Sequence, residues 1–143
     1  MLGIIDQIFI NKYGQGIIGI DPFKVLFSNF NTRNKRDFLE GIISLIVQSK
    51  PMNDDIDAAI KESGLKPTFT PCILLGKGIA NHNLSKLANL PESELEKTLI
   101  LLMNLFKIGY TRRFMEEKNN PDKWWYWDLS QPNIADKILK NYE

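Results

Sequence analysis

The sequence predicts an all-α protein: a single globular domain over residues 1–143, with about five to seven helices around a central helix near residues 91–118. The first observation is the central segment, where positions 95, 99, 102, 106 and 110 are apolar and step by three and four along one helical face. The second is that capping residues, prolines and glycines divide the rest of the chain into short helical segments. The third is length, because 143 residues suit one domain with its own core.

The segments of the first third begin and end at recognisable signals. Asp21-Pro22 predicts a helix start, with a capping acceptor followed by proline at the first helical position. Thr32 or Asn34 caps the next helix, which ends at Lys50 because the residue before a proline is pushed out of the α region. Its expected inward face consists of Phe38, Ile42, Leu45, Ile46 and Ser49. Residues 1–20 fit one or two helical turns or a short strand, followed by a glycine-rich loop.

The middle and the end of the chain contain the same kinds of helix start and stop signals. Asn53 is expected to cap a helix whose first turn carries acidic residues, which favour the helix dipole, and Gly64 to end it. Thr70-Pro71 predicts another cap followed by a short apolar helix, and a small helix is expected around residues 83–89. After the central helix, a brief turn carries three tryptophans, and Ser130 opens the last helix.

The composition excludes several classes of function. The net charge is +1, from 18 basic and 17 acidic residues, so no overall field would attract nucleic acid or an anionic membrane. Cys72 is the single cysteine, so no intramolecular disulfide can form. The apolar runs are far shorter than the roughly 20 residues of a membrane span, and the N-terminal segment lacks the basic region of a signal peptide. We therefore expect a cytoplasmic protein that is not bound to a membrane.

No group of residues predicts catalysis, a metal site or a cofactor. Cys72 and His82 could form a nucleophile–base pair, but a thiol within an apolar run is typically buried and inert. One cysteine and one histidine cannot make a usual zinc site. The Gly76-Lys77-Gly78 segment lacks the Ser or Thr and the earlier glycine of a phosphate-binding loop. The sequence therefore favours a non-enzyme, without deciding the question.

The most distinctive feature is a set of aromatic and basic residues at the end of the central helix and just after it, consisting of Arg112, Arg113, Trp124, Trp125 and Trp127. Tryptophan and arginine dominate binding hot spots, so these residues could form an exposed anchor for a protein partner. Alternatively, the tryptophans attach the last helix to the core, and the arginines pair with Glu116 and Glu117 at i, i+4.

Four segments resemble a bacterial family of small single-domain proteins of unknown function. They are Gly64–Pro71, with the pattern Lys-Pro-Thr-x-Thr-Pro; Lys86–Pro91 followed by Glu94; Gly109–Arg113; and Trp124-Trp125. The resemblance covers about residues 55–128 and implies no known activity. It implies that the Pro67–Pro71 segment, the arginine pair and the tryptophan pair belong together.

Three functional hypotheses follow. The first is a non-catalytic interaction protein, regulatory or immunity-like, that binds an unidentified protein partner; self-association is compatible with it. The second is an enzyme or small-ligand binder whose pocket is lined by Arg112, Arg113, Thr68, Thr70 and Trp124. The third and least favoured is binding of single-stranded nucleic acid by base stacking on the tryptophans.

Overall fold

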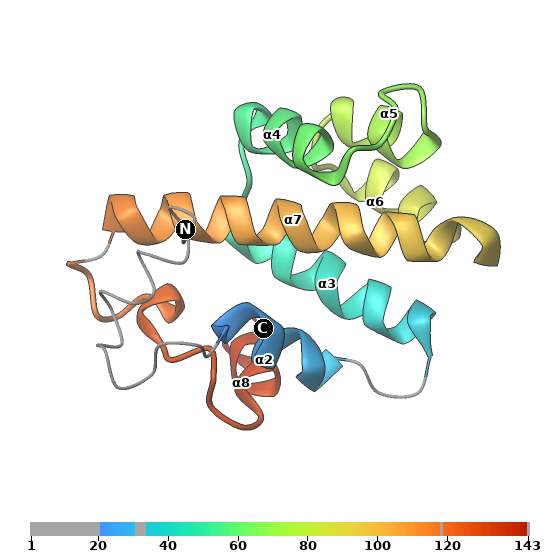
Figure 1. The fold of residues 1–143 in the computed structure, drawn as a ribbon. Coiled ribbons are helices and arrows are strands. Elements are labelled where there is room, and N and C mark those ends of the chain that lie inside the picture. Colours follow the sequence, from blue (N-terminus) through green and yellow to red (C-terminus); the bar gives the residue numbers. More distant parts are fainter. Residues whose placement is uncertain (1–20, 31–33, 118, 143) are drawn as a thin grey trace.

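The computed structural model describes residues 21–30, 34–117 and 119–142, and these ranges contain helices and turns but no strand (Figure 1). The all-α prediction is therefore confirmed. The helices are α2 (Pro22–Phe30), α3 (Lys35–Ser49), α4 (Asn53–Ser63), α5 (Thr70–Gly76), α6 (Asn81–Ala88), α7 (Glu92–Glu117) and α8 (Ile134–Tyr142), with a 3₁₀ turn η2 (Trp124–Tyr126) between the last two.

Helix α7 runs through the middle of the molecule and the other helices pack around it. Helices α4, α5 and α6 lie on one side of it, α2 and α8 lie on the other, and α3 runs beside it (Figure 1). The predicted face is buried: positions 95, 99, 102, 106 and 110 are all at most 8% exposed. The helices do not enclose α7 completely, because Ile100 keeps 43% of its surface exposed.

At two of the predicted helix starts, a side chain caps the helix. The carboxylate of Asp21 accepts hydrogen bonds from the backbone N–H groups of Phe23 (3.0 Å) and Lys24 (3.3 Å) at the start of α2. Of the two expected caps for α3, Asn34 is the one observed, and its side-chain oxygen accepts from the N–H of Asp37 at 2.8 Å. Thr32 and the segment 1–20 lie outside the described residues.

Three predicted boundaries are wrong by one to four residues. Asn53 is the first residue of α4, and the cap position is Met52, whose N–H donates to the Asp55 carboxylate at 2.8 Å. Thr70 lies inside α5. The last helix begins at Ile134, because the Ser130 hydroxyl donates to Asp128 at 2.6 Å in a preceding turn and caps no helix.

The Gly64 prediction is correct. Gly64 ends α4 with φ = +68°, in the left-handed region that favours glycine.

Across the described ranges, no helix combines the length and the apolar character that crossing a membrane requires.

Candidate functional site

Arg112 is held by polar partners from three parts of the chain. Its Nε donates to Asp55 Oδ2 at 2.9 Å, and its terminal nitrogens donate to the carboxylate of Glu116 at 3.0 Å and to the carbonyl of Lys50 at 3.3 Å. Burial by itself would lower the pKa of Arg112, but the hydrogen bonds to the two carboxylates outweigh it and raise that pKa. Arg112 is thus a structural connection between the start of α4 and the end of α7. The pair with Glu116 follows the predicted spacing; Asp55 was not predicted.

Arg113 differs from its neighbour in having no carboxylate partner among the described residues. Its guanidinium lies over the Trp125 ring, 5.0 Å from the ring centroid. Within the described ranges it forms no ion pair, so the predicted pair with Glu117 is not formed. The Nε atom of Arg113 is buried and has no hydrogen-bond partner there.

Trp124 and Trp125 belong to the core, with 5% and 4% of their surfaces exposed. The Trp124 ring is nearly parallel to that of Phe106, at 6.2 Å between centroids. The Tyr110 hydroxyl donates to the backbone carbonyl of Trp125. Trp127 is half-buried. The tryptophan pair therefore fastens η2 to α7 and does not form an exposed anchor.

Thr68 and Thr70 are exposed and lie at or just before the start of α5, which is on the same side of α7 as α4 and α6 (Figure 1). Between them, the Phe69 ring is 5.9 Å from the ammonium of Lys97, close to the start of α7. Lys97 and Arg112 are fifteen residues apart, or about 22 Å along a helix. The structure therefore does not assemble the pocket expected from the two threonines and the two arginines. The grouping implied by the family resemblance does not hold for the Pro67–Pro71 segment either.

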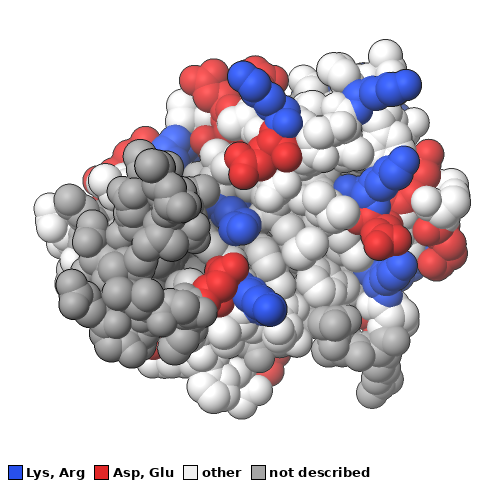
Figure 2. Space-filling model, viewed as in Figure 1, with Lys and Arg blue, Asp and Glu red and all other residues white. Residues whose placement is uncertain are grey.

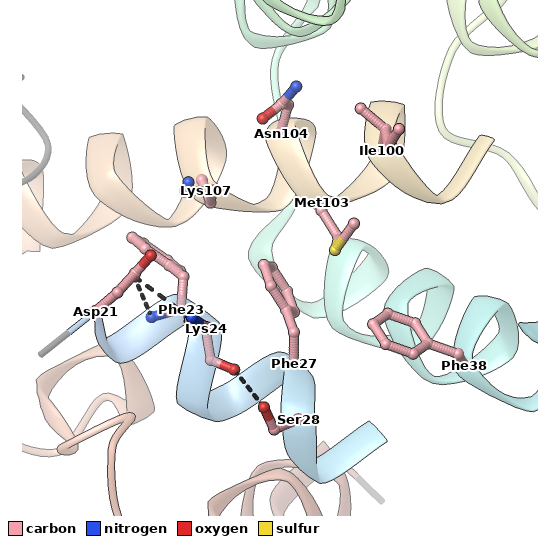
Figure 3. A pocket seen from close by; sticks show the side chains of 10 residues that line it. All are labelled: Asp21, Phe23, Lys24, Phe27, Ser28, Phe38, Ile100, Met103, Asn104 and Lys107. Carbon is pink, nitrogen blue, oxygen red and sulfur yellow. Dashed lines mark hydrogen bonds between the residues drawn. The ribbon is translucent and has the colours of Figure 1, made fainter. Parts of the chain in front are cut away.

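An open apolar groove of about 400 Å³ lies between α2, α3 and α7, and we call it the phenylalanine groove. Figure 3 shows Phe27, Phe38 and Met103 pointing toward one another across it. The space-filling view of this side shows an uncharged area across the middle, with most charged side chains around it (Figure 2). The groove is lined by Asp21, Phe23, Lys24, Phe27, Ser28, Phe38, Ile100, Met103, Asn104 and Lys107.

The sequence predicted only that Phe38 lies on the inward face of its helix, and it did not predict a groove. The signal available in the sequence was the number and spacing of the phenylalanines in this groove. Phe23 and Phe27 lie on one face of α2, and Phe38 lies one turn into α3. Phe23 and Phe27 are buried, at 2% and 8% exposure, whereas Ile100 at the edge remains 43% exposed. Only the packing of three helices shows which apolar residues stay accessible.

A second hollow, which we call the Arg113 pocket, lies at the C-terminal end of α7 and measures about 330 Å³. Gln48 and Lys50 line it from the end of α3, Asp122 and Lys123 from the segment before η2, and Arg113 from α7. Parts of Trp124 and Trp125 complete its wall. It contains three of the predicted binding residues, Arg113, Trp124 and Trp125, and lacks the other four.

The remaining reactive side chains do not form a site. Cys72 is 2% exposed, and burial raises the pKa of its thiol, which disfavours the nucleophilic thiolate. His82 is exposed. In the part of the chain that the structure describes, no three His, Cys, Asp or Glu side chains lie close enough together to hold a metal ion.

Comparison with known proteins identifies a family but no characterised relative. The model of a family of unknown function, DUF5958, matches residues 5–128. This match extends further toward the N-terminus than the resemblance seen in the sequence. No curated protein and no solved structure shows significant similarity to the chain.

Proposed function

Because the chain belongs to the DUF5958 family, whose function is unknown, we propose from its own surface that it is a non-catalytic protein-interaction module, regulatory or immunity-like. The observation that carries this proposal is the phenylalanine groove. The groove has an accessible apolar floor, because the packing of the three helices around it leaves the groove open. Exposed apolar grooves of this kind are typical of surfaces that bind another protein.

The shape of the groove favours a helical segment as the bound element. Its two sides are α2 and α7, which together with the cap residue Asp21 supply nine of the ten lining residues, and Phe38 of α3 lies at one end. Phe27 and Met103 face each other across it (Figure 3). A partner helix with apolar side chains at i, i+3, i+4 and i+7 would place one row of them along such a floor.

The charges at the rim favour a partner with acidic residues beside its apolar face. Lys24 and Lys107 stand at the rim, and the Lys107 ammonium is 5.7 Å from the centroid of the Phe23 ring. Neither lysine forms an ion pair with another described residue. The carboxylate of Asp21 is the one acidic group in the lining, and it is engaged in capping α2. Opposite charges on a partner would set its orientation and speed its association.

The lining is poorly suited to catalysis. The Ser28 hydroxyl donates to the Lys24 carbonyl at 2.8 Å, and the lining includes no imidazole or thiol that could activate it. Asp21 is the single carboxyl group in the lining and it caps α2, so the lining has no pair of carboxyl groups for acid–base catalysis.

The test compares two equally exposed apolar residues on the same helix. Ile100, 43% exposed, lies in the groove, whereas Met115, 47% exposed, lies outside it near the end of α7. A photo-crosslinking amino acid at position 100 or 115, introduced in the source cells, would identify proteins that contact each position. A protein crosslinked from position 100 alone would then be purified, and its affinity measured for wild type, Ile100→Glu and Met115→Glu.

We expect Ile100→Glu to weaken binding at least about tenfold, because completing the burial of a half-exposed isoleucine is worth about 1 kcal/mol and a buried carboxylate adds a further penalty. Met115→Glu should change the affinity by less than about twofold. Both variants should retain the far-ultraviolet circular dichroism of the wild type. Equal loss of affinity in both variants, or crosslinks from position 100 only within the same chain, would refute the proposal.

A further inference from the structure

The Arg113 pocket collects more positive charge than its one acidic side chain neutralises. Lys50, Arg113 and Lys123 line it, with Asp122 as the single carboxylate, so the lining has a formal charge of +2 (3 − 1). None of the three cations forms an ion pair with any other described residue. The adjacent Arg112 shows the contrast, because it contacts two carboxylates and a carbonyl. Arg112 forms ion pairs within the fold, whereas Arg113 contacts the Trp125 ring and forms no ion pair with a described residue.

Two buried donors in the lining lack acceptors among the described residues. Gln48 is 6% exposed, and its side-chain nitrogen has no hydrogen-bond partner. The buried Nε of Arg113 has none either. Buried polar groups in native proteins are almost always paired, and two such groups at one pocket call for a common explanation. Both are donors, so the group that would satisfy them is an acceptor.

The backbone geometry supports the position of the lysine at the edge of the pocket. Lys50 ends α3 in the left-handed region, with φ = +46°, which is unusual for a residue with a side chain. Its carbonyl accepts from Arg112 at 3.3 Å, and its N–H donates to the carbonyl of Ile46 at 3.1 Å. These contacts hold Lys50 beside the pocket at some conformational cost.

The aromatic walls limit what kind of ligand fits. The Trp124 ring is covered by Phe106 and Tyr110, and the Trp125 ring is covered by the guanidinium of Arg113. The indole faces that these groups cover are closed to stacking by a flat ring. The pocket is therefore suited to the oxygen atoms of a compact anion more than to an aromatic body.

We propose that the Arg113 pocket binds the phosphate group of a small phosphorylated molecule. A phosphate monoester carries close to two negative charges at neutral pH, which matches the +2 lining. A guanidinium fork and ammonium groups are the usual partners of phosphate oxygens, and the Gln48 amide adds a neutral donor. The volume of about 330 Å³ accommodates more than the phosphate itself and lies at the lower end of the range for small-molecule sites.

The experiment is a titration of the full chain with inorganic phosphate at constant ionic strength, followed by two-dimensional ¹H–¹⁵N NMR. Side-chain signals of Gln48 and Trp125 report on the pocket, and Trp127 reports on a nearby position outside its lining. Sulfate and acetate serve as comparison anions, and glycerol 3-phosphate as a small phosphate monoester. The key variant is Arg113→Gln, and Lys97→Gln is the control, because it removes the same charge from the other end of α7.

We expect saturable shifts of the Gln48 and Trp125 signals with phosphate and with the monoester, and affinities reduced about tenfold or more by Arg113→Gln. Lys97→Gln should leave them within about twofold. Lys123→Gln, a change at an exposed position, provides a second test in case Arg113→Gln affects folding, and it should also weaken binding.

The proposal is overturned by the absence of saturation up to about 20 mM phosphate, or by equal effects of Lys97→Gln and Arg113→Gln. Equal binding of acetate and phosphate would also overturn it, because the site would then not select a phosphate group. The phenylalanine groove and the Arg113 pocket share no lining residue, so the two proposals fail independently.

Discussion

Replacing Asp55 by alanine should destabilise the protein far more than the same change at its neighbour Asp54. The side chain of Asp55 is 5% exposed, and its Oδ2 accepts two hydrogen bonds, from Arg112 Nε at 2.9 Å and from the Met52 N–H at 2.8 Å. Asp54 is exposed in the same first turn of α4. Both acids lie near the positive end of the helix dipole, so that contribution largely cancels in the comparison.

The magnitude follows from the two hydrogen bonds. A hydrogen bond to a charged partner contributes about 1.5–3 kcal/mol, and loss of a helix-capping acceptor costs about 1 kcal/mol. Arg112 keeps its pair with Glu116 and is 21% exposed, so the penalty for leaving it without Asp55 is at the low end for buried pairs. We expect Asp55→Ala to lower the free energy of unfolding by about 3 kcal/mol, and Asp54→Ala by less than about 0.5 kcal/mol.

Urea denaturation followed by circular dichroism measures both variants. With a slope of about 2 kcal/mol per molar urea, the midpoint should fall by about 1.5 M for Asp55→Ala and by less than about 0.3 M for Asp54→Ala. A double-mutant cycle with Arg112→Ala should show a coupling of at least about 1 kcal/mol between Asp55 and Arg112. Equal midpoints for the two alanine variants, or a coupling near zero, would show that the ion pair does not contribute as inferred.

Three further predictions test the core. Leu102→Ala should lower the free energy of unfolding by about 3 kcal/mol and Ile100→Ala by less than about 1 kcal/mol in urea, because Leu102 is 0% and Ile100 43% exposed. Tyr110→Phe should cost about 1–2 kcal/mol in the same assay, because it removes the hydrogen bond from the Tyr110 hydroxyl to the buried carbonyl of Trp125; an unchanged midpoint would contradict that bond. The Cys72 thiol, buried and with a raised pKa, should react with a disulfide reagent at least about 100-fold more slowly in the native state than in urea; equal rates would show that it is accessible.

Local signals in the sequence were sufficient for the helices. The apolar spacing along α7 predicted its buried face, and Asp21 and Gly64 predicted the start of α2 and the end of α4. These features depend on residues within one or two turns of each other, so they can be recognised without knowing the fold. A predicted helix start was wrong where a polar side chain could either cap a helix or form a turn. Ser130 is an example, because it forms a turn with Asp128.

The candidate site was only partly predictable. Arg113, Trp124 and Trp125 were chosen from the sequence and do line one pocket, although as core residues and not as an exposed anchor. Gln48 and Lys50 were missed, because nothing in the sequence separates a buried amide near a helix end from an exposed one.

The sequence alone thus determined that the described parts of the chain are helical, roughly where the helices lie, and which face of the central helix is buried. The tertiary structure alone decided that Asp55 pairs with Arg112, 57 residues away, and that Thr68 lies far from the arginines. It also decided which apolar and basic groups remain accessible in the phenylalanine groove and the Arg113 pocket. The physical reason is that helix formation depends on near neighbours in the chain, whereas pockets and ion pairs form between segments that only packing brings together.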